Sequence, residues 1–231
     1  MAADWLFLTG WGWKPVIWQR IWRHWEKGGN LWAPELRSTD LLDQVDLLAK
    51  HLPETCHVVG WSLGGMVAMH LAARYPGRIK SLVLLACNPW FVGDDIWPGV
   101  GSDLLHGFIT GMQQQPEQQQ QDFLAWQCLG DRELRRGLPG AASLLVPPRS
   151  SYLSYQLSWL AWDARQILQS CPQPRLALFG KQDRLVPQQL SGALVDMGVV
   201  CEVMEPLGHI LPWHGQVLAQ RLQRWSQEVC L

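Results

Sequence analysis

HVVGWSLGGMVAMHLAARY, the sequence of residues 57–75, combines three signals that decide the fold. It begins with a short β-prone run, His57 to Val59. Gly60 to Gly64 then match the pattern G-x-S-x-G, which places a serine on a sharp turn between a strand and a helix. Apolar residues recur at helical spacing from Met66 to Tyr75, and Pro76-Gly77 ends the helix. The segment is therefore predicted to fold as strand, tight turn and helix.

The turn is predicted to expose Ser62 at the N-terminus of that helix. There the free backbone amides and the helix dipole favour developing negative charge. A side chain at Gly60 or Gly64 would clash with the neighbouring backbone of so tight a turn. The alternative is a glycine-rich turn without chemistry, since a motif this short also arises by chance. Suitable partners later in the chain favour a nucleophile.

Apolar runs on both sides of this segment continue an alternation of strands and helices. The first helix is predicted to end near Gly28, and the second, from about residue 41, to be capped by Ser38 or Thr39. Alternating strands and helices form parallel sheets with right-handed crossovers, so we predict an α/β fold with a mostly parallel sheet of about six strands. The strands are predicted at residues 5–8, 31–33, 57–59, 79–86, 175–179 and 199–204.

The alternation stops between residues 88 and 170. This stretch has no comparable strand run and includes a glutamine-rich segment, residues 113–121, which reads as a solvated helix face or a loop between helices. We predict an α/β core formed by residues 1–87 and 171–231. Residues 88–170, hereafter the inserted segment, are predicted to form a helical cap over it.

Three chemically suitable residues follow predicted strands in the order Ser62, Asp183, His209. The carboxyl ends of parallel strands meet at one edge of the sheet, where α/β proteins build their sites. A serine hydroxyl needs an adjacent base, and a histidine base needs an acid to fix its tautomer. Asp183 could instead be a turn residue, and His214 is a rival base. His70, on the helix after Ser62, is predicted to be a packing residue.

Two backbone amides are predicted to stabilise the oxyanion. One is that of Leu63, directly after the nucleophile, and the other is that of Trp11, in the glycine-rich loop after the first strand. An ordinary strand-to-helix turn is the alternative for that loop. Aromatic side chains of the inserted segment could form the walls of an apolar site, although packing is the simpler account of any one of them. We expect Trp11, Leu63, Trp90 and Phe123 to contact the substrate.

The composition is that of a soluble protein without a nucleic-acid footprint. Hydrophobic residues make up 48% of 231 residues and the net charge is −1. The N-terminus lacks the pattern of a signal peptide, and no apolar run is long enough to span a membrane. The six cysteines are scattered singly, which favours buried thiols in a reducing cytoplasm and no metal site. We expect a monomer that uses no cofactor.

Four motifs together resemble the α/β-hydrolase superfamily: Gly10-Trp11-Gly12, Gly60 to Gly65, Gly180-x-x-Asp183-x-x-Val186-Pro187 and Gly208-His209. Motifs of the inserted segment are typical of a narrower group of proteins. They resemble the esterases of biotin synthesis that act on the methyl ester of pimeloyl-acyl carrier protein, and the similarity extends over nearly the whole chain. These motifs are Asn88-Pro89-Trp90-Phe91, Trp97-Pro98-Gly99 and Leu104-Leu105-x-Gly107-Phe108.

The resemblance implies a serine carboxylesterase that releases methanol from a carrier-bound ester. It also implies that basic residues of the cap meet the acidic carrier protein. Arg132, Arg135 and Arg136 cluster in the inserted segment and are the candidates, although a charge cluster is also typical of a solvated face. A short-chain esterase or thioesterase with the same catalytic residues is the alternative function, and an inactive binding protein of the same fold is a third.

The chain departs from the family pattern in three places. Thr9 stands where the family usually has a histidine, and the loop at residues 33–38 lacks the usual Asp-x-x-Gly-x-Gly-x-Ser. The leading hairpin is expected to be missing. These departures leave the three candidate catalytic residues in place and affect the loops that shape the substrate pocket.

Overall fold

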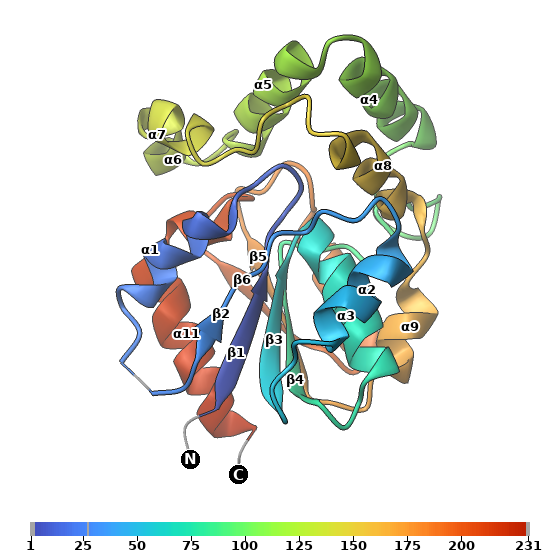
Figure 1. The fold of residues 1–231 in the computed structure, drawn as a ribbon. Coiled ribbons are helices and arrows are strands. Elements are labelled where there is room, and N and C mark those ends of the chain that lie inside the picture. Colours follow the sequence, from blue (N-terminus) through green and yellow to red (C-terminus); the bar gives the residue numbers. More distant parts are fainter. Residues whose placement is uncertain (1–2, 27, 230–231) are drawn as a thin grey trace.

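The fold is built on a parallel sheet of six strands, as predicted. The computed structural model describes residues 3–26 and 28–229 (Figure 1). The strand order is β2-β1-β3-β4-β5-β6, and every pair of neighbours is parallel. The chain runs from β1 outward to β2 and then crosses to β3, so the strand order reverses between β1 and β3. The strands are β1 Asp4–Leu8, β2 Leu31–Trp32, β3 Cys56–Trp61, β4 Ile79–Leu85, β5 Arg175–Gly180 and β6 Val200–Met204.

Both faces of the sheet are buried under helices. Successive residues of a strand point to opposite faces, so Leu6 and Leu8 join one core cluster, whereas Trp5 and Phe7 join the other. The helices on the first face are α2 (Leu41–Ala49), α3 (Leu63–Arg74), α9 (Arg165–Ser170) and α10 (Leu190–Asp196). The second face is covered by α1 (Gln19–Trp22) and α11 (Gly215–Glu228), at the left in Figure 1.

Two local predictions about helices are wrong. The first helix consists of a 3-10 turn, Pro15–Trp18, followed by the single turn of α1, and does not continue to Gly28. Beyond α1 the chain turns through i→i−3 hydrogen bonds, because Trp25 packs edge-on against β1. The N-cap of α2 is Asp40, whose carboxylate accepts a hydrogen bond from the Asp43 amide at 2.9 Å. A carboxylate also complements the positive end of the helix dipole, which neither predicted cap could do.

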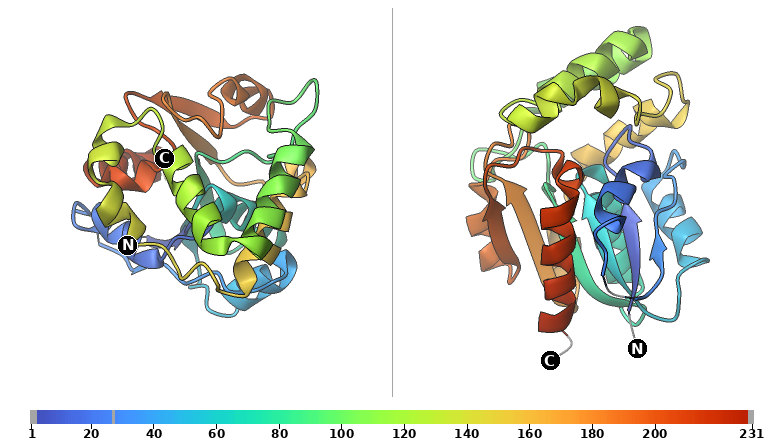
Figure 2. Two further views of the ribbon diagram at one scale, coloured as in Figure 1. Left: turned by 90° about the horizontal axis from the view of Figure 1, so that it is seen from above. Right: turned by 90° about the vertical axis from the view of Figure 1, so that its left-hand side faces the viewer.

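The last helix of the inserted segment, α9, covers the first face of the sheet, and its five other helices lie beyond the carboxyl ends of the strands (Figures 1 and 2). The glutamine-rich residues span the end of α4 and the start of α5, and Gln120 is buried, where its amide donates to the Val146 carbonyl at 3.1 Å. Gln120 is therefore packed, whereas most of the run is exposed, as predicted for a solvated helix face. The helices are α4 Ser102–Gln114, α5 Pro116–Gln127, α6 Arg132–Arg136, α7 Leu138–Ala142 and α8 Tyr152–Ser158. Two further 3-10 turns are Trp159–Ala161, after α8, and Leu211–Trp213, before α11.

The cysteines within the described residues are all free thiols. Cys56 and Cys87 are buried, and burial raises the pKa of each thiol to about 12, so neither is a reactive nucleophile. Cys230 lies outside the described residues. Across residues 3–26 and 28–229, no cluster of three or more His, Cys, Asp or Glu side chains could hold a metal ion. Within the same residues no helix is long and apolar enough to cross a membrane.

A buried histidine lies under the sheet on the side of α11. The His57 ring stacks on Trp5, its Nδ1 lies 2.7 Å from Ser81 Oγ, and the Trp225 indole donates to the same oxygen at 3.0 Å. His57 Nε2 has no hydrogen-bond partner within the described residues. Burial, with a smaller contribution from the charge of Lys80, lowers the pKa of His57 to about 4. The folded protein therefore holds this ring neutral in mildly acidic solution.

His57 is expected to make stability depend on pH. The unfolded chain binds a proton below about pH 6.5 and the folded chain only near pH 4, so acid favours unfolding across that window. The contribution of His57 to the free energy of unfolding should fall by about 2 kcal/mol between pH 7 and pH 5. Urea unfolding of wild type and His57→Phe at both pH values measures it, and parallel pH dependences would contradict it. Both proteins carry the same carboxylates, so the difference isolates His57.

Candidate active site

Ser62 lies at the sharp turn between β3 and α3. Its φ of 53° and ψ of −120° are strained for a residue with a side chain, and it is partly accessible while the residues around it are buried. A Cβ on Gly60 would lie 2.6 Å from the Gly65 Cα, and one on Gly64 would overlap the carbonyl oxygens of Leu8 and Thr9. The predicted steric need for both glycines is confirmed.

The two later residues of the predicted set meet Ser62 at the carboxyl edge of the sheet. His209 Nε2 lies 3.2 Å from Ser62 Oγ, and His209 Nδ1 lies 2.8 Å from Asp183 Oδ2. Asp183 and His209 are both buried. The three side chains form one hydrogen-bonded line, so a proton leaving the serine has a base within reach and the base has an anionic partner.

The Asp183 carboxylate is held by its own loop. Its Oδ1 accepts the backbone amides of Leu185 at 2.8 Å and Val186 at 3.0 Å, while Oδ2 faces His209. Asp183 follows β5 and His209 follows β6, and these strands are neighbours in the sheet. The two backbone donors fix which oxygen faces the imidazole.

Trp61 is a supporting residue that the sequence analysis missed. Its indole lies buried beneath the site and donates to the backbone carbonyl of His209 at 3.0 Å. The residue before the nucleophile thus anchors the loop that carries the base, across 148 positions of sequence. No local pattern could have indicated this contact, because it depends on how β3 and the loop after β6 are packed.

The two other candidate histidines are engaged elsewhere. His214 Nε2 lies 2.7 Å from Asp131 Oδ2, so its ring is paired with the inserted segment and not with Ser62. His70 is partly buried on α3 and meets the edge of Trp162, with ring centroids 6.0 Å apart. Of the three histidines considered, only His209 lies beside Ser62.

The candidate oxyanion amides border the serine. Neither the Trp11 amide nor the Leu63 amide has a hydrogen-bond acceptor within the described residues. A Cβ on Gly10 would lie 3.4 Å from Ser62 Cβ, so the loop after β1 passes close to the nucleophile. The Trp11 indole is tied to the inserted segment through a 2.8 Å hydrogen bond to the Leu153 carbonyl. Both candidate amides are thus unpaired within the described residues and belong to segments next to Ser62.

An apolar cavity opens from Ser62 and His209 toward α4 and α5. Trp11, Phe108 and Phe123 cluster in it, with ring centroids 4.8–5.4 Å apart. Its free volume is about 30 Å³, which is about the room of one water molecule. The remaining lining residues are Phe91, Leu104, Leu105, Trp126, Leu160 and Leu185. An acyl chain can therefore enter only if these side chains or the helices above them move apart.

Trp90 does not belong to this cavity lining. The Arg165 guanidinium lies 4.3 Å from the centre of the Trp90 ring, a cation–π contact between the start of the inserted segment and its last helix, α9. Trp97 and Trp159 are buried, with indole nitrogens bonded to Asn88 Oδ1 and the Thr39 carbonyl. Packing, rather than contact with a ligand, accounts for these three tryptophans, none of which lines the cavity.

The candidate docking arginines share the short helix α6. Arg132, Arg135 and Arg136 are all exposed, and no ion pair joins them to a carboxylate of the described residues. Arg149, the other arginine near them in sequence, forms a surface ion pair with Glu117. The three guanidinium groups of α6 are therefore available to an external acid.

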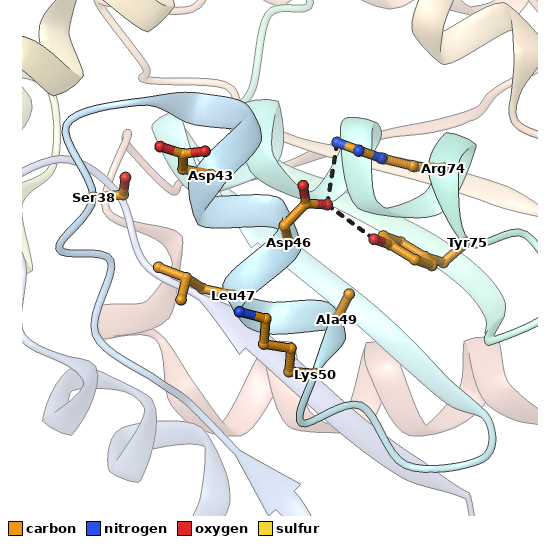
Figure 3. A pocket seen from close by; sticks show the side chains of 8 residues that line it. All are labelled: Ser38, Asp43, Asp46, Leu47, Ala49, Lys50, Arg74 and Tyr75. Atoms are coloured by element: carbon orange, nitrogen blue, oxygen red, sulfur yellow. Dashed lines mark hydrogen bonds and ion pairs between the residues drawn. The ribbon is translucent and has the colours of Figure 1, made fainter.

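A much larger hollow, about 760 Å³, lies on the outer surface of α2 and α3 (Figure 3). Three of its polar side chains are paired with one another: Asp46 accepts from Tyr75 at 2.9 Å and pairs with Arg74 at 3.1 Å. None of the side chains drawn in Figure 3 belongs to the Ser62 site. Size alone does not mark the chemically active place on this molecule.

The sequence is similar to an established family and to curated relatives. The model of the alpha/beta hydrolase family matches residues 5–221. A pimeloyl-[acyl-carrier protein] methyl ester esterase of Methylococcus capsulatus is 33% identical over 238 residues, covering 95% of this chain and 93% of that protein. A protein of the same name from Pectobacterium carotovorum is 31% identical, covering 83% of this chain and 80% of its own.

Solved structures share the fold at lower sequence identity. A bromoperoxidase from Bacillus anthracis superposes with a TM-score of 0.81 at 17% identity, covering 98% of this chain and 92% of that one. An esterase from Exiguobacterium antarcticum gives the same TM-score and identity, covering 98% and 93%. At this identity the likeness concerns the fold and not the substrate.

Proposed function

The chain belongs to the alpha/beta hydrolase family, and we propose that it hydrolyses the methyl ester of pimeloyl-acyl carrier protein in biotin synthesis. The observation that carries the chemistry is the hydrogen-bonded line from Ser62 through His209 to Asp183 at the mouth of an apolar cavity. The substrate assignment rests on the relatives that match nearly the whole chain.

In the first half of the proposed reaction, Ser62 Oγ attacks the ester carbonyl while His209 Nε2 takes its proton. Asp183 holds the proton on His209 Nδ1 and stabilises the imidazolium. The amides of Trp11 and Leu63 bind the oxyanion of the tetrahedral intermediate. The intermediate collapses when the bond to the methoxy oxygen breaks, and His209 returns the proton so that methanol leaves. An ester of Ser62 remains.

In the second half, a water molecule attacks that ester. His209 takes a proton from the water, a second tetrahedral intermediate forms, and its collapse returns the proton to Ser62 Oγ. The product is the free carboxylic acid. The reaction needs no cofactor, because the three side chains and two amides supply nucleophile, base and charge stabilisation. We propose a monomeric enzyme, since one chain holds all these groups, and a cytoplasmic one, since the described cysteines are free thiols.

The cavity suits the hydrocarbon part of the substrate. Trp11 and Phe123, which line the cavity, are proposed to contact the acyl chain, and the apolar lining offers no charged partner to it. Leu63 is buried and does not line the cavity, so we propose that it contacts the substrate through its backbone amide. We propose that residues 88–170 act as a cap over a core of residues 1–87 and 171–231, and that the cap opens to admit the chain. Trp90 could contact substrate only in such an opened form.

Methanol release from purified protein tests the substrate. Pimeloyl-acyl carrier protein methyl ester is compared with p-nitrophenyl acetate, with a serine-reactive fluorophosphonate as the inhibitor control. Fast, inhibitor-sensitive release of methanol from the carrier-bound ester supports the proposal. Turnover of only the small ester would leave a general esterase and remove the substrate assignment. Turnover of neither would point to a binding protein.

Reversing the charges of α6 is expected to weaken recognition of the carrier. Changing Arg132, Arg135 and Arg136 to glutamate places repulsive charges opposite an acidic partner, and KM for the carrier-bound ester should rise about tenfold or more at low salt. Steady-state kinetics at two salt concentrations measure this effect. A charge-matched control changes the exposed Lys50, Lys80 and Arg224 to glutamate. Equal effects in both triple variants would contradict specific docking.

A further inference from the structure

A second carboxylate–histidine pair, Asp131 with His214, lies next to the proposed catalytic residues and has no part in the chemistry above. Asp131 is buried in the turn between α5 and α6, where it is the N-cap of α6. His214 immediately precedes α11. The pair therefore joins the inserted segment to the core.

The Asp131 carboxylate collects hydrogen bonds from three separate segments. Oδ1 accepts the Leu134 amide of α6 at 3.0 Å. Oδ2 accepts His214 Nε2 at 2.7 Å and the backbone amide of Gly208 at 3.2 Å. Burial alone would raise the pKa of Asp131, but the bonds from His214, Leu134 and Gly208 outweigh it and lower that pKa. The carboxylate thus stays ionised and accepts hydrogen bonds through both of its oxygens.

The same turn presses against both loops that carry candidate catalytic residues. Gly130 has a φ of +87°, and a Cβ on it would lie 2.5 Å from the Gln182 carbonyl, next to Asp183. A Cβ on Gly208, next to His209, would lie 3.0 Å from Asp131 Cβ. The two loops are joined to each other by the Gln182 amide, which donates to the Leu207 carbonyl at 2.8 Å. The turn at residues 130–131 therefore packs against the loop that carries Asp183 and the loop that carries His209, and these two loops also contact each other.

Helix α6 is also seated on the core just beyond this turn. A Cβ on Gly137, at the end of α6, would meet the ring of Trp213 at 2.6 Å. The Arg20 guanidinium lies 3.7 Å from the centre of the same ring. Figures 1 and 2 show α6 above the ends of α1 and α11. The Asp131 contact is thus part of a packed interface and not an isolated surface bond.

We propose that Asp131 is a positioning residue for His209. It fixes the turn at Gly208 through a backbone hydrogen bond, and so holds the imidazole in line between Asp183 and Ser62. His214 keeps the Asp131 carboxylate oriented toward that amide. The inference rests on the proposed hydrolytic function for its kinetic consequence, whereas its structural consequence, a change at His209, does not depend on any substrate.

The test separates the capping role of Asp131 from the positioning role. Serine is itself a good N-cap, so Asp131→Ser keeps the bond to the Leu134 amide but is too short to reach Gly208 and His214. Asp40→Ser is the matched control, because Asp40 caps α2 in the same way and touches neither loop. With p-nitrophenyl acetate, kcat of Asp131→Ser should fall about 10- to 100-fold with KM within twofold of wild type. Asp40→Ser should match wild type.

A spectroscopic signature completes the experiment. The deshielded proton between His209 Nδ1 and Asp183, observed by ¹H NMR, should shift or broaden in Asp131→Ser and stay unchanged in Asp40→Ser. If Asp131→Ser fails to fold, His214→Leu replaces it and should move the same resonance. An unchanged resonance and kcat in a folded variant would overturn the proposal. Absence of esterase activity in wild type would instead count against the proposed function and leave the NMR result interpretable.

Discussion

We expect Ser62→Ala to lower kcat for the carrier-bound ester by about 10⁵-fold or more. The substitution removes the only atom of the site that forms a bond to the acyl group, while His209, Asp183 and the two amides remain. KM should change little, because the apolar cavity and α6 are untouched. Methanol release under saturating substrate measures the effect. A loss of less than about 100-fold would mean that Ser62 is not the nucleophile.

The fold of this variant is expected to be intact. Alanine, like serine, has a Cβ, so the strained φ of 53° at position 62 costs about the same in both proteins. The free energy of unfolding should stay within about 0.5 kcal/mol of the wild-type value. Ser170→Ala, at an exposed serine far along the inserted segment, is a matched control and should retain wild-type kcat. Loss of activity together with loss of folding would leave the role of Ser62 unproven and require Ser62→Cys.

The proximity of Ser62, Asp183 and His209 could be predicted, because the strands of a parallel sheet all end at the same edge. Each of them follows an apolar strand run, and every parallel strand delivers its next residue to the same edge of the sheet. The reversal of strand order between β1 and β3 then explains why the loop with Trp11 lies beside Ser62. Strand periodicity and chain order were sufficient for this much.

The supporting contacts could not be predicted in the same way. Trp61 and Asp131 act through backbone atoms of the loop around His209, and each reaches it across 77 positions or more. Such contacts depend on the packed geometry of the loops, for which the sequence carries no periodic signal. The predicted N-cap of α2 and the predicted end of the first helix were wrong for a related reason. Competition between neighbouring side chains decides where a helix begins and ends.

Asp183→Asn is expected to lower kcat about 10⁴-fold while leaving the shape of the site unchanged. An asparagine could in principle turn its oxygen toward His209. Here it cannot, because the amides of Leu185 and Val186 both require an oxygen at the Oδ1 position. The new NH₂ group must therefore face His209 Nδ1 and donate to it. The imidazole proton then moves to Nε2, and no lone pair remains there to take the proton of Ser62.

The size of this loss, compared with that of Asp196→Asn, distinguishes tautomer control from a general charge effect. Asp196 is an exposed residue at the end of α10, so its substitution removes the same charge from the same loop-and-helix unit without touching the imidazole. It should leave kcat at the wild-type value. If Asp183→Asn loses less than about tenfold, His209 keeps its working tautomer without Asp183, and another group must hold it. Because the Asp183 loop supplies two fixed donors, that outcome would require the loop itself to rearrange, which a shift in the amide resonances of Leu185 and Val186 would reveal.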